Sequence, residues 1–371
     1  MNQIQKFLIA ASLLLQIPLA LPAQPREQPE QSYKVGVITR TFVPTEPYHW
    51  RGAKTHALIT TIWYPADPVS IEQPQWVGSP SSPFMSAGRA APDAKLVSSP
   101  AKLPLILLSH GTGSSSPLMA WLGEALASHG YIAAAVNHPG NNSLEDYTLQ
   151  GFTLWWERAT DLSAILDKLL ADSTFGSRID SKRLGAAGFS LGGFTIMEIA
   201  GGFGELSLYA DFCNSPRADG MCVDPLEFPG LLSKEKELAK TDPEFQAALQ
   251  DAKRSHRDPR VRAVFAIAPA LGPAFHPDSL EKISIPVEIA AGEDDSVVPV
   301  GSSAKFFAAH IKEAKLTFLP RVGHYTFLAT CADLGRRIRP ELCNDAAGVD
   351  RDAIHAQTAA LALRFFAANL K

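Results

Sequence analysis

The residues with the clearest chemical meaning lie at 188–192, which read Gly-Phe-Ser-Leu-Gly, a G-x-S-x-G pattern. An apolar run at 184–189 leads into Ser190, and a helix-like segment begins directly after Gly192. A strand that turns sharply into a helix would hold the Ser190 hydroxyl above a sheet, at a helix N-terminus that favours negative charge. This context predicts a nucleophilic serine. In the alternative interpretation, Ser190 only caps the helix.

A serine nucleophile needs a general base, and His324 is the predicted base. Of the ten histidines it alone lies in a Gly-His loop after the last expected strand, at residues 316–319. Its position also gives the chain order serine, acid, histidine. His110 precedes Ser190 in the chain, so we expect it to stabilise a loop by hydrogen bonding and not to act as the base.

Three consecutive carboxylates, Glu293, Asp294 and Asp295, offer an acid that would orient the histidine. They lie in a turn after an expected strand at 287–291. A hydrophobic pair and a proline follow Asp295 and would fix the turn, which favours Asp295 as the inward-facing acid. We interpret the other two as solvated turn residues. The alternative is that all three carboxylates lie on the surface.

An oxyanion hole requires two backbone N–H groups aimed at the developing negative charge. Leu191, directly after the predicted nucleophile, would supply one of them. The glycine-rich loop at 109–113 would supply the other, and we predict the N–H of Thr112 for this role. Acyl transfer with these groups implies no metal and no organic cofactor.

The elements that must hold these residues follow an α/β pattern. Continuous apolar strands alternate with amphipathic helices, which predicts a mostly parallel central sheet with helices on both faces. Active sites in such sheets lie at the carboxyl ends of the strands. Strands are expected at 103–109, 131–136, 183–189, 261–268, 287–291 and 316–319, and helices at 118–128, 158–170, 301–311 and 352–370.

Two regions depart from this alternation. Residues 33–43 and 56–64 are β-rich and predict an antiparallel hairpin, after which the Pro- and Ser-rich residues 65–103 predict a long surface connection. The alternation also breaks at about 203–260. Because this insertion directly follows the nucleophile's helix, we expect a lid or cap over the strand ends, the alternative being an excursion without a role. One domain is expected across 33–371.

The first 23 residues predict a secretory signal peptide. Lys6 supplies a positive charge, an apolar run follows at 7–15, and a small-residue stretch ends at Ala23. This run is too short for a bilayer, which needs about 20 residues, although an uncleaved anchor is the alternative. Residues 24–32 are expected to be a flexible polar leader. The protein is therefore expected in the periplasm or outside the cell, without a stable membrane anchor.

Export would place the four cysteines in an oxidising compartment. They form two local couples, Cys213 with Cys222 and Cys331 with Cys343, and we predict a disulfide within each. Buried free thiols are the alternative. None lies in a C-x-x-C arrangement, which argues against a zinc knuckle or a redox motif.

The charge of the chain limits which partners it could bind. A net charge of −4 without a long basic block argues against nucleic acid. Residues 138–141 (His-Pro-Gly-Asn) follow another strand at the same end of the sheet and either line the pocket or shape the loop. Trp155 and Trp156 could form a wall of the acyl site, but we favour a role in core packing.

Taken together, these stretches resemble the α/β-hydrolase superfamily. The closer resemblance is to exported bacterial proteins of the dienelactone-hydrolase-like and platelet-activating-factor-acetylhydrolase-like types. Dienelactone hydrolases carry a cysteine nucleophile where this chain has Ser190, and the acid turn at 292–299 looks like that of polyester hydrolases and cutinase-like enzymes. The matching stretches are 108–113, 135–141, 188–193, 267–272, 292–299 and 323–328.

The resemblance implies a serine hydrolase that cleaves carboxylic esters of small molecules or lipids through an acyl-enzyme. Amide, thioester or phospholipid acyl hydrolysis by the same groups are alternatives. A non-catalytic binding protein built on a hydrolase fold is the alternative from a different class.

Overall fold

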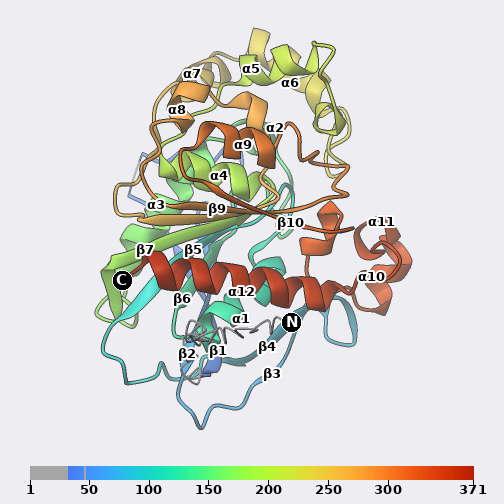
Figure 1. Ribbon diagram of the computed structural model, residues 1–371. Coiled ribbons are helices and arrows are strands. Elements are labelled where there is room, and N and C mark those ends of the chain that lie inside the picture. The colour runs from blue at the N-terminus through green and yellow to red at the C-terminus, as the bar shows by residue number, and fades with distance from the viewer. Residues whose placement is uncertain (1–31, 46) are drawn as a thin grey trace, which may run out of the picture. The chain divides into compact units, whose positions relative to one another are not determined.

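A ten-stranded sheet runs through the residues that the computed structural model describes, 32–45 and 47–371 (Figure 1). The predicted signal peptide at 1–23, and all but Ser32 of the predicted leader, lie outside the described residues. In spatial order the strands are β10 (Lys315–Leu319), β9 (Val287–Gly292), β8 (Ala263–Ile267), β7 (Ile179–Phe189), β5 (Leu103–Ser109), β6 (Ile132–Val136), β2 (Leu58–Ala66), β1 (Lys34–Phe42), β4 (Ser82–Pro92) and β3 (Gln73–Ser79).

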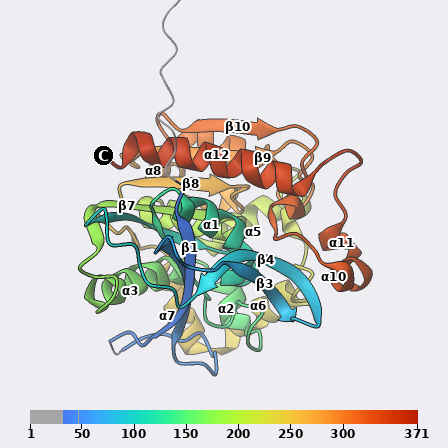
Figure 2. The same cartoon turned by 90° about the horizontal axis from the view of Figure 1, so that it is seen from below.

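The part of the sheet from β10 to β6 is parallel throughout. Its strands β5, β6, β8 and β9 are buried at every residue, which explains why their sequences are continuously apolar and do not alternate. β2 joins this part in the antiparallel sense and pairs with β1 as the predicted hairpin. Figure 2 shows β10 and the β3–β4 pair at opposite ends of the sheet. The predicted α/β class with a mostly parallel sheet is confirmed.

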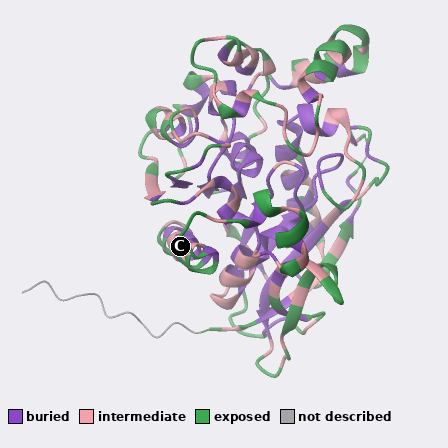
Figure 3. Cartoon of the chain, turned by 90° about the vertical axis from the view of Figure 1, so that its right-hand side faces the viewer, coloured by how far each residue is buried: buried purple, intermediate pink, exposed green. Residues whose placement is uncertain are grey.

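Helices cover both faces of this sheet (Figure 1). α1 (Ala120–Ser128) and α12 (Arg351–Asn369) pack on one face, and α3 (Glu157–Ala171), α4 (Leu191–Ala200) and α9 (Ala304–His310) on the other. Each face therefore has its own apolar core, and the buried strands lie between the two cores (Figure 3). The shorter helices are η1 (Ser116–Met119), α2 (Leu149–Thr153), η3 (Gly272–Ala274), α8 (Pro277–Leu280), η4 (His324–Phe327), α10 (Asp333–Ile338) and α11 (Pro340–Cys343).

The expectation of a surface connection at 65–103 is wrong. Residues 73–79 and 82–92 of this segment form β3 and β4, and β4 pairs with β1 at Gly36 and Val37. Its prolines suggested a loop, but an edge strand tolerates proline because half of its N–H groups face away from the neighbouring strand. Met85 and Ala90 of β4 are buried, so this hairpin contributes to the core as well as to the sheet edge.

Residues 203–260, which we call the cap segment, contain α5 (Leu206–Cys213), η2 (Gly220–Cys222), α6 (Leu231–Thr241) and α7 (Pro243–Asp251). In Figure 1 these helices lie beyond α4, on the side away from α12. The charged stretch from Leu231 to Asp251 forms two helices, α6 and α7. The carboxylate of Asp242 accepts hydrogen bonds from the N–H groups of Glu244 and Phe245, and Pro243 starts α7, so a new helix begins there.

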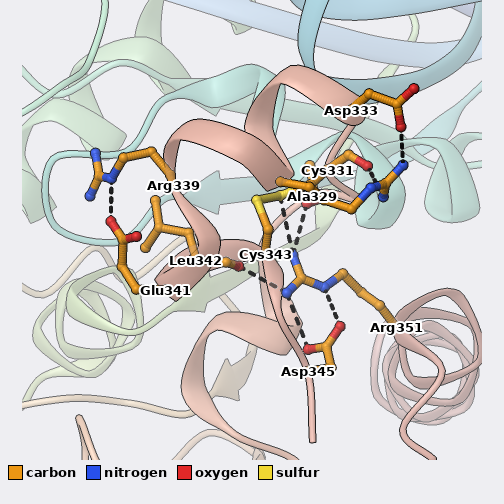
Figure 4. The surroundings of a disulfide bond; sticks show 10 residues. Ala329, Cys331, Asp333, Arg339, Glu341, Leu342, Cys343, Asp345 and Arg351 are labelled. Carbon is orange, nitrogen blue, oxygen red and sulfur yellow. Dashed lines mark hydrogen bonds and ion pairs between the residues drawn. A yellow bond between two sulfur atoms is a disulfide. The ribbon is translucent and has the colours of Figure 1, made fainter. Parts of the chain in front are cut away.

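Both predicted cysteine couples are disulfides: Cys213 is bonded to Cys222 and Cys331 to Cys343. The second bond lies next to the buried side chain of Arg351, which donates hydrogen bonds to Asp345 and to the carbonyl oxygens of Leu342 and Ala329 (Figure 4). Within the described residues, no helix has the length and apolar character needed to cross a membrane.

Candidate active site

Ser190 sits at a sharp turn between β7 and α4. Its φ of 57° and ψ of −118° place it in a region that residues with a side chain rarely adopt. Two flanking glycines permit the turn. A Cβ on Gly188 would lie 2.1 Å from the carbonyl oxygen of Gly192, and a Cβ on Gly192 would lie 1.9 Å from that of Ser109. The G-x-S-x-G spacing is therefore a steric requirement of this turn.

Ser190, His324 and Asp295 form one hydrogen-bonded chain. The Oγ of Ser190 lies 2.9 Å from Nε2 of His324, and Nδ1 of the same ring lies 2.7 Å from Oδ2 of Asp295. All three residues are buried. They come from three separate strand ends, β7, β9 and β10, which the parallel sheet brings to one edge.

Asp295 is distinguished from its two neighbours by burial and by its hydrogen bonds. Glu293 and Asp294 are exposed, as expected for solvated turn residues. The Oδ1 of Asp295 accepts hydrogen bonds from the N–H groups of Val297 at 3.0 Å and Val298 at 2.7 Å. These bonds fix the carboxylate so that Oδ2 is directed at His324.

The predicted oxyanion groups lie beside Ser190. Thr112 and Leu191 both line the cavity that contains the Ser190 hydroxyl. A Cβ on Gly111 would be 3.3 Å from the Cβ of Ser190, so the loop after β5 passes directly over the serine. The N–H of Gly113 donates to Oδ1 of Asn141 at 2.7 Å and anchors the far side of this loop. Residues 138–141 therefore support the loop and are not part of the cavity wall.

His110 and His138 are fully buried behind this loop. Burial, reinforced by the nearby positive charge of Arg158, holds the pKa of both rings well below the ordinary value, so both are neutral. His110 has Nδ1 against the carbonyl oxygen of Gly111 and accepts the N–H of His138 at Nε2. Because both ring nitrogens are occupied by backbone, His110 has the loop-stabilising position expected from the sequence.

A buried ionic cluster underlies the two histidines. Asp161 is fully buried and accepts from Arg51 at 2.6 Å and from Nδ1 of His138 at 2.7 Å. Arg158, which is also buried, donates to Oγ1 of Thr195 at 3.1 Å and to the carbonyl oxygen of His110. The cluster thus connects α3, α4 and the loop after β5, the elements that position Ser190 and the predicted oxyanion groups.

The Ser190 hydroxyl faces a cavity of about 860 Å³. Tyr209, Met221 and Leu231 of the cap segment line it. Trp155 lines the cavity while packing on Phe194 and Tyr209, whereas Trp156 packs against the cap segment. Further lining residues are Val77, Phe84, Met85, Tyr147, Phe152, Leu271, Val297, Tyr325, Leu328, Arg339 and Leu342.

Two features of the site were missed by the sequence analysis. The β3–β4 hairpin forms one wall of the cavity, and it was hidden because its segment was interpreted as a loop. Arg158 and Asp161 lie in a helix that was interpreted as amphipathic, where charged residues usually face water. A lone Arg-x-x-Asp spacing carries no signal of burial. Among the described residues, no three His, Cys, Asp or Glu side chains are grouped so that they could hold a metal ion.

The chain resembles known esterases in sequence and in structure. Residues 71–153 match the family model for platelet-activating factor acetylhydrolase, isoform II. A solved structure of a ferulic acid esterase from Streptomyces cinnamoneus superposes with a TM-score of 0.60, covering 94% of this chain and 92% of that one at 20% identity. This near-complete superposition, together with the order of the strands, decides the fold. The chain is an α/β hydrolase by fold.

Curated relatives match this chain over shorter stretches. Lipase 1 of Moraxella sp. (strain TA144) is 41% identical over 80 residues, which are 22% of each chain. Cutinase est1 of Thermobifida alba is 35% identical over 97 residues, 26% of this chain and 29% of the cutinase. The matched stretch thus spans less than a third of these relatives, each of which is named as a lipase or a cutinase.

Proposed function

We propose that this α/β hydrolase cleaves carboxylic esters, with Ser190 as the nucleophile. The observation that carries the proposal is the unbroken hydrogen-bonded chain from Ser190 through His324 to Asp295 at the edge of an apolar cavity. A strained serine at a helix N-terminus, with a buried imidazole and carboxylate in line behind it, is the arrangement that activates a hydroxyl.

The chemistry follows from the positions of the atoms. As Oγ of Ser190 bonds to the ester carbonyl carbon, Nε2 of His324 takes the hydroxyl proton, and Asp295 stabilises the resulting imidazolium. The N–H groups of Thr112 and Leu191 hold the oxyanion. When the carbon–oxygen bond to the alcohol breaks, His324 returns the proton to the leaving oxygen. A water molecule, deprotonated by His324, then hydrolyses the acyl-enzyme and regenerates Ser190.

The named similarities support an ester as the substrate. The cutinase, the lipase and the ferulic acid esterase differ in what their names say they act on, but each name denotes an ester hydrolase. The cavity is lined mostly by apolar and aromatic side chains, which favours esters with an apolar acyl or alcohol part over charged ones.

A fluorophosphonate probe and a panel of p-nitrophenyl esters test the proposal together. The wild-type chain should be labelled at Ser190 and should release p-nitrophenol, and the Ser190→Ala variant should do neither while unfolding at the same temperature. A folded wild-type chain that neither reacts with the probe nor hydrolyses any ester of the panel would indicate a binding protein with a hydrolase fold.

We also infer that the protein is exported. The signal-like residues 1–23 and the two disulfides support this inference, because such bonds persist in oxidising compartments. Expression of the full chain in a bacterium with a periplasm tests it. Mature protein recovered from the periplasm or medium should begin at Gln24, and recovery only from the cytoplasm with residues 1–23 intact would contradict export.

The cap segment is proposed to act as a cover over the acyl pocket. Its residues Tyr209, Met221 and Leu231 contribute side chains to the cavity, which supports a role in substrate enclosure. Replacing 206–251 by a short Gly-Ser linker should raise KM for apolar esters at least tenfold, measured beside fluorophosphonate labelling of Ser190. Equal KM values for both chains would contradict the proposal.

A further inference from the structure

A buried carboxyl group lies on the wall of the apolar cavity. Glu235 is on α6 and is 9% exposed, and it lines the same cavity as Ser190. Its atom Oε2 is buried and has no hydrogen-bond partner within the described residues. Burying a carboxyl group without a partner is costly, so an unsatisfied one facing a substrate cavity requires an explanation.

The position of Glu235 on its helix would suit an apolar side chain. α6 turns one face towards the cavity, and Leu231, Leu232 and Glu235 line the cavity from that face. Flanking residues such as Lys234 and Lys236 are exposed. A helix buries apolar side chains at this spacing, so leucine at 235 would complete the apolar stripe. The chain instead places there a carboxyl group whose buried Oε2 has no partner.

Asp224, another acidic residue of the cavity, already has partners. Asp224 accepts the N–H groups of Gly230 at 2.8 Å and Leu232 at 2.9 Å. The hydroxyl of Tyr209, which lines the same cavity, donates to the carbonyl oxygen of Met221. Glu235 is therefore left for a group that the protein does not supply.

We propose that Glu235 is a substrate-binding subsite for an uncharged hydroxyl on the part of the ester remote from the reacting carbonyl. The proposal rests on the proposed esterase function. A hydroxyl suits this environment because it can donate to a carboxylate and accept from a carboxylic acid. A substrate ammonium group is less suitable, because the surrounding wall is apolar and would have to accept an ion taken out of water.

Burial raises the pKa of Glu235 to about 7, so both protonation states are present near neutral pH. This agrees with a hydroxyl ligand, which can pair with either state. A plain alkyl chain placed against the carboxyl group would leave it desolvated and unpaired. A site built to hydrogen-bond a hydroxyl discriminates against the analogue that lacks it.

Matched ester pairs measure this preference. One pair is p-nitrophenyl hexanoate and its ω-hydroxy analogue, and the other is hexyl acetate and its ω-hydroxy analogue, so the acyl and alcohol sides are probed separately. Each pair is repeated over a series of chain lengths. In at least one pair, kcat/KM should be about tenfold higher for the hydroxy ester at the best length.

Two substitutions identify the residue responsible. Glu235→Gln keeps hydrogen-bonding atoms in place and should retain most of the preference, whereas Glu235→Leu should abolish or invert it. The comparison uses the ratio within each variant, so a general change of activity does not affect it. Fluorophosphonate titration of Ser190 counts the active molecules in every preparation.

The outcomes are distinguishable. If no ester is hydrolysed by the wild type, the proposed function fails. If esters are hydrolysed with equal kcat/KM for hydroxy and alkyl members at every length, or if Glu235→Leu keeps the preference, the subsite is overturned. A stronger preference for ω-amino than for ω-hydroxy esters would also overturn it, because Glu235 would then be a cation site.

Discussion

Oδ2 of Asp295 lies 2.7 Å from Nδ1 of His324, while the Oδ1 atom of the same carboxylate is held by two backbone N–H groups. The two oxygens therefore have fixed and different tasks. An asparagine at 295 would keep its oxygen towards the backbone donors and turn its NH₂ group towards the imidazole. Nδ1 of His324 would then have to accept a hydrogen bond from this NH₂ group. Nε2 would already carry the ring proton and could not take the proton of the Ser190 hydroxyl.

From this arrangement we expect Asp295→Asn to lower kcat by about 10⁴ without unfolding the protein. Asp294→Asn and Glu293→Gln are the matched controls, because both side chains are exposed in the same turn. Steady-state kinetics on the three variants provide the comparison. A crippled Asp294→Asn beside an active Asp295→Asn would mean that the turn presents a different carboxylate.

Arg158→Lys tests the buried cluster behind the loop that follows β5. Lysine keeps the charge but loses the planar fork that reaches both Thr195 and the carbonyl oxygen of His110. We expect unfolding free energy to fall by about 2 kcal/mol or more, and kcat to fall at least tenfold with little change in KM. Chemical denaturation and p-nitrophenyl ester kinetics measure the two effects. If Arg158→Lys lowers stability but leaves kcat unchanged, the cluster stabilises the fold without affecting the reaction.

Removal of the second disulfide should affect both stability and substrate binding. Cys331 and Cys343 close a loop of 12 residues, which corresponds to about 3 kcal/mol in the chain-entropy model. Leu328 and Leu342 of the same region line the cavity, so the Cys331→Ser, Cys343→Ser double variant should also raise KM. The Cys213→Ser, Cys222→Ser double variant, which removes the other disulfide, is measured beside it for comparison. The Tm of both double variants is measured under non-reducing conditions and should lie below that of the wild type. A Tm equal to that of the wild type would mean that the disulfide does not stabilise the fold.

Glu124 gives a prediction on pH. It lies on α1, its Oε1 is buried without a partner, and burial raises its pKa from 4.5 to about 7. Between these values the folded protein keeps a proton that the unfolded chain has lost, so stability falls as pH rises through this window. Glu124→Gln removes the penalty, by about 3 kcal/mol at most above pH 7.

The measurement is the Tm of Glu124→Gln minus that of wild type at a series of pH values. The difference should grow from about pH 4.5 to about pH 7 and then stay constant. Glu237→Gln, an exposed site on α6, is the control and should give a difference near zero. A difference for Glu124→Gln that does not vary with pH would contradict the assignment.

Sequence patterns were sufficient to predict a site residue wherever local geometry and chain order both constrain that residue. Ser190 is bounded by glycines that the turn requires, and His324 follows the last strand, so the structure brings both together with Asp295 as expected. Patterns failed where a residue's environment depends on distant segments. Arg158 and Asp161 became buried because Arg51, about 100 positions earlier, packs against the same helix. The β3–β4 hairpin was missed because proline at a sheet edge resembles proline in a loop.

That hairpin is joined to the far end of the chain. The N–H of Ser86 donates to the carbonyl oxygen of Thr330 at 2.8 Å, the N–H of Ala332 donates to that of Phe84 at 3.0 Å, and Met85 bridges to Cys331. One wall of the cavity is thus formed where residues 84–86, near the start of the chain, pair with residues 330–332, near its end; we call this pairing the seam. During synthesis, a chain that has reached only residue 324 already contains Ser190, Asp295 and His324 but lacks this seam. This wall of the cavity is therefore completed only after every proposed catalytic residue has been made.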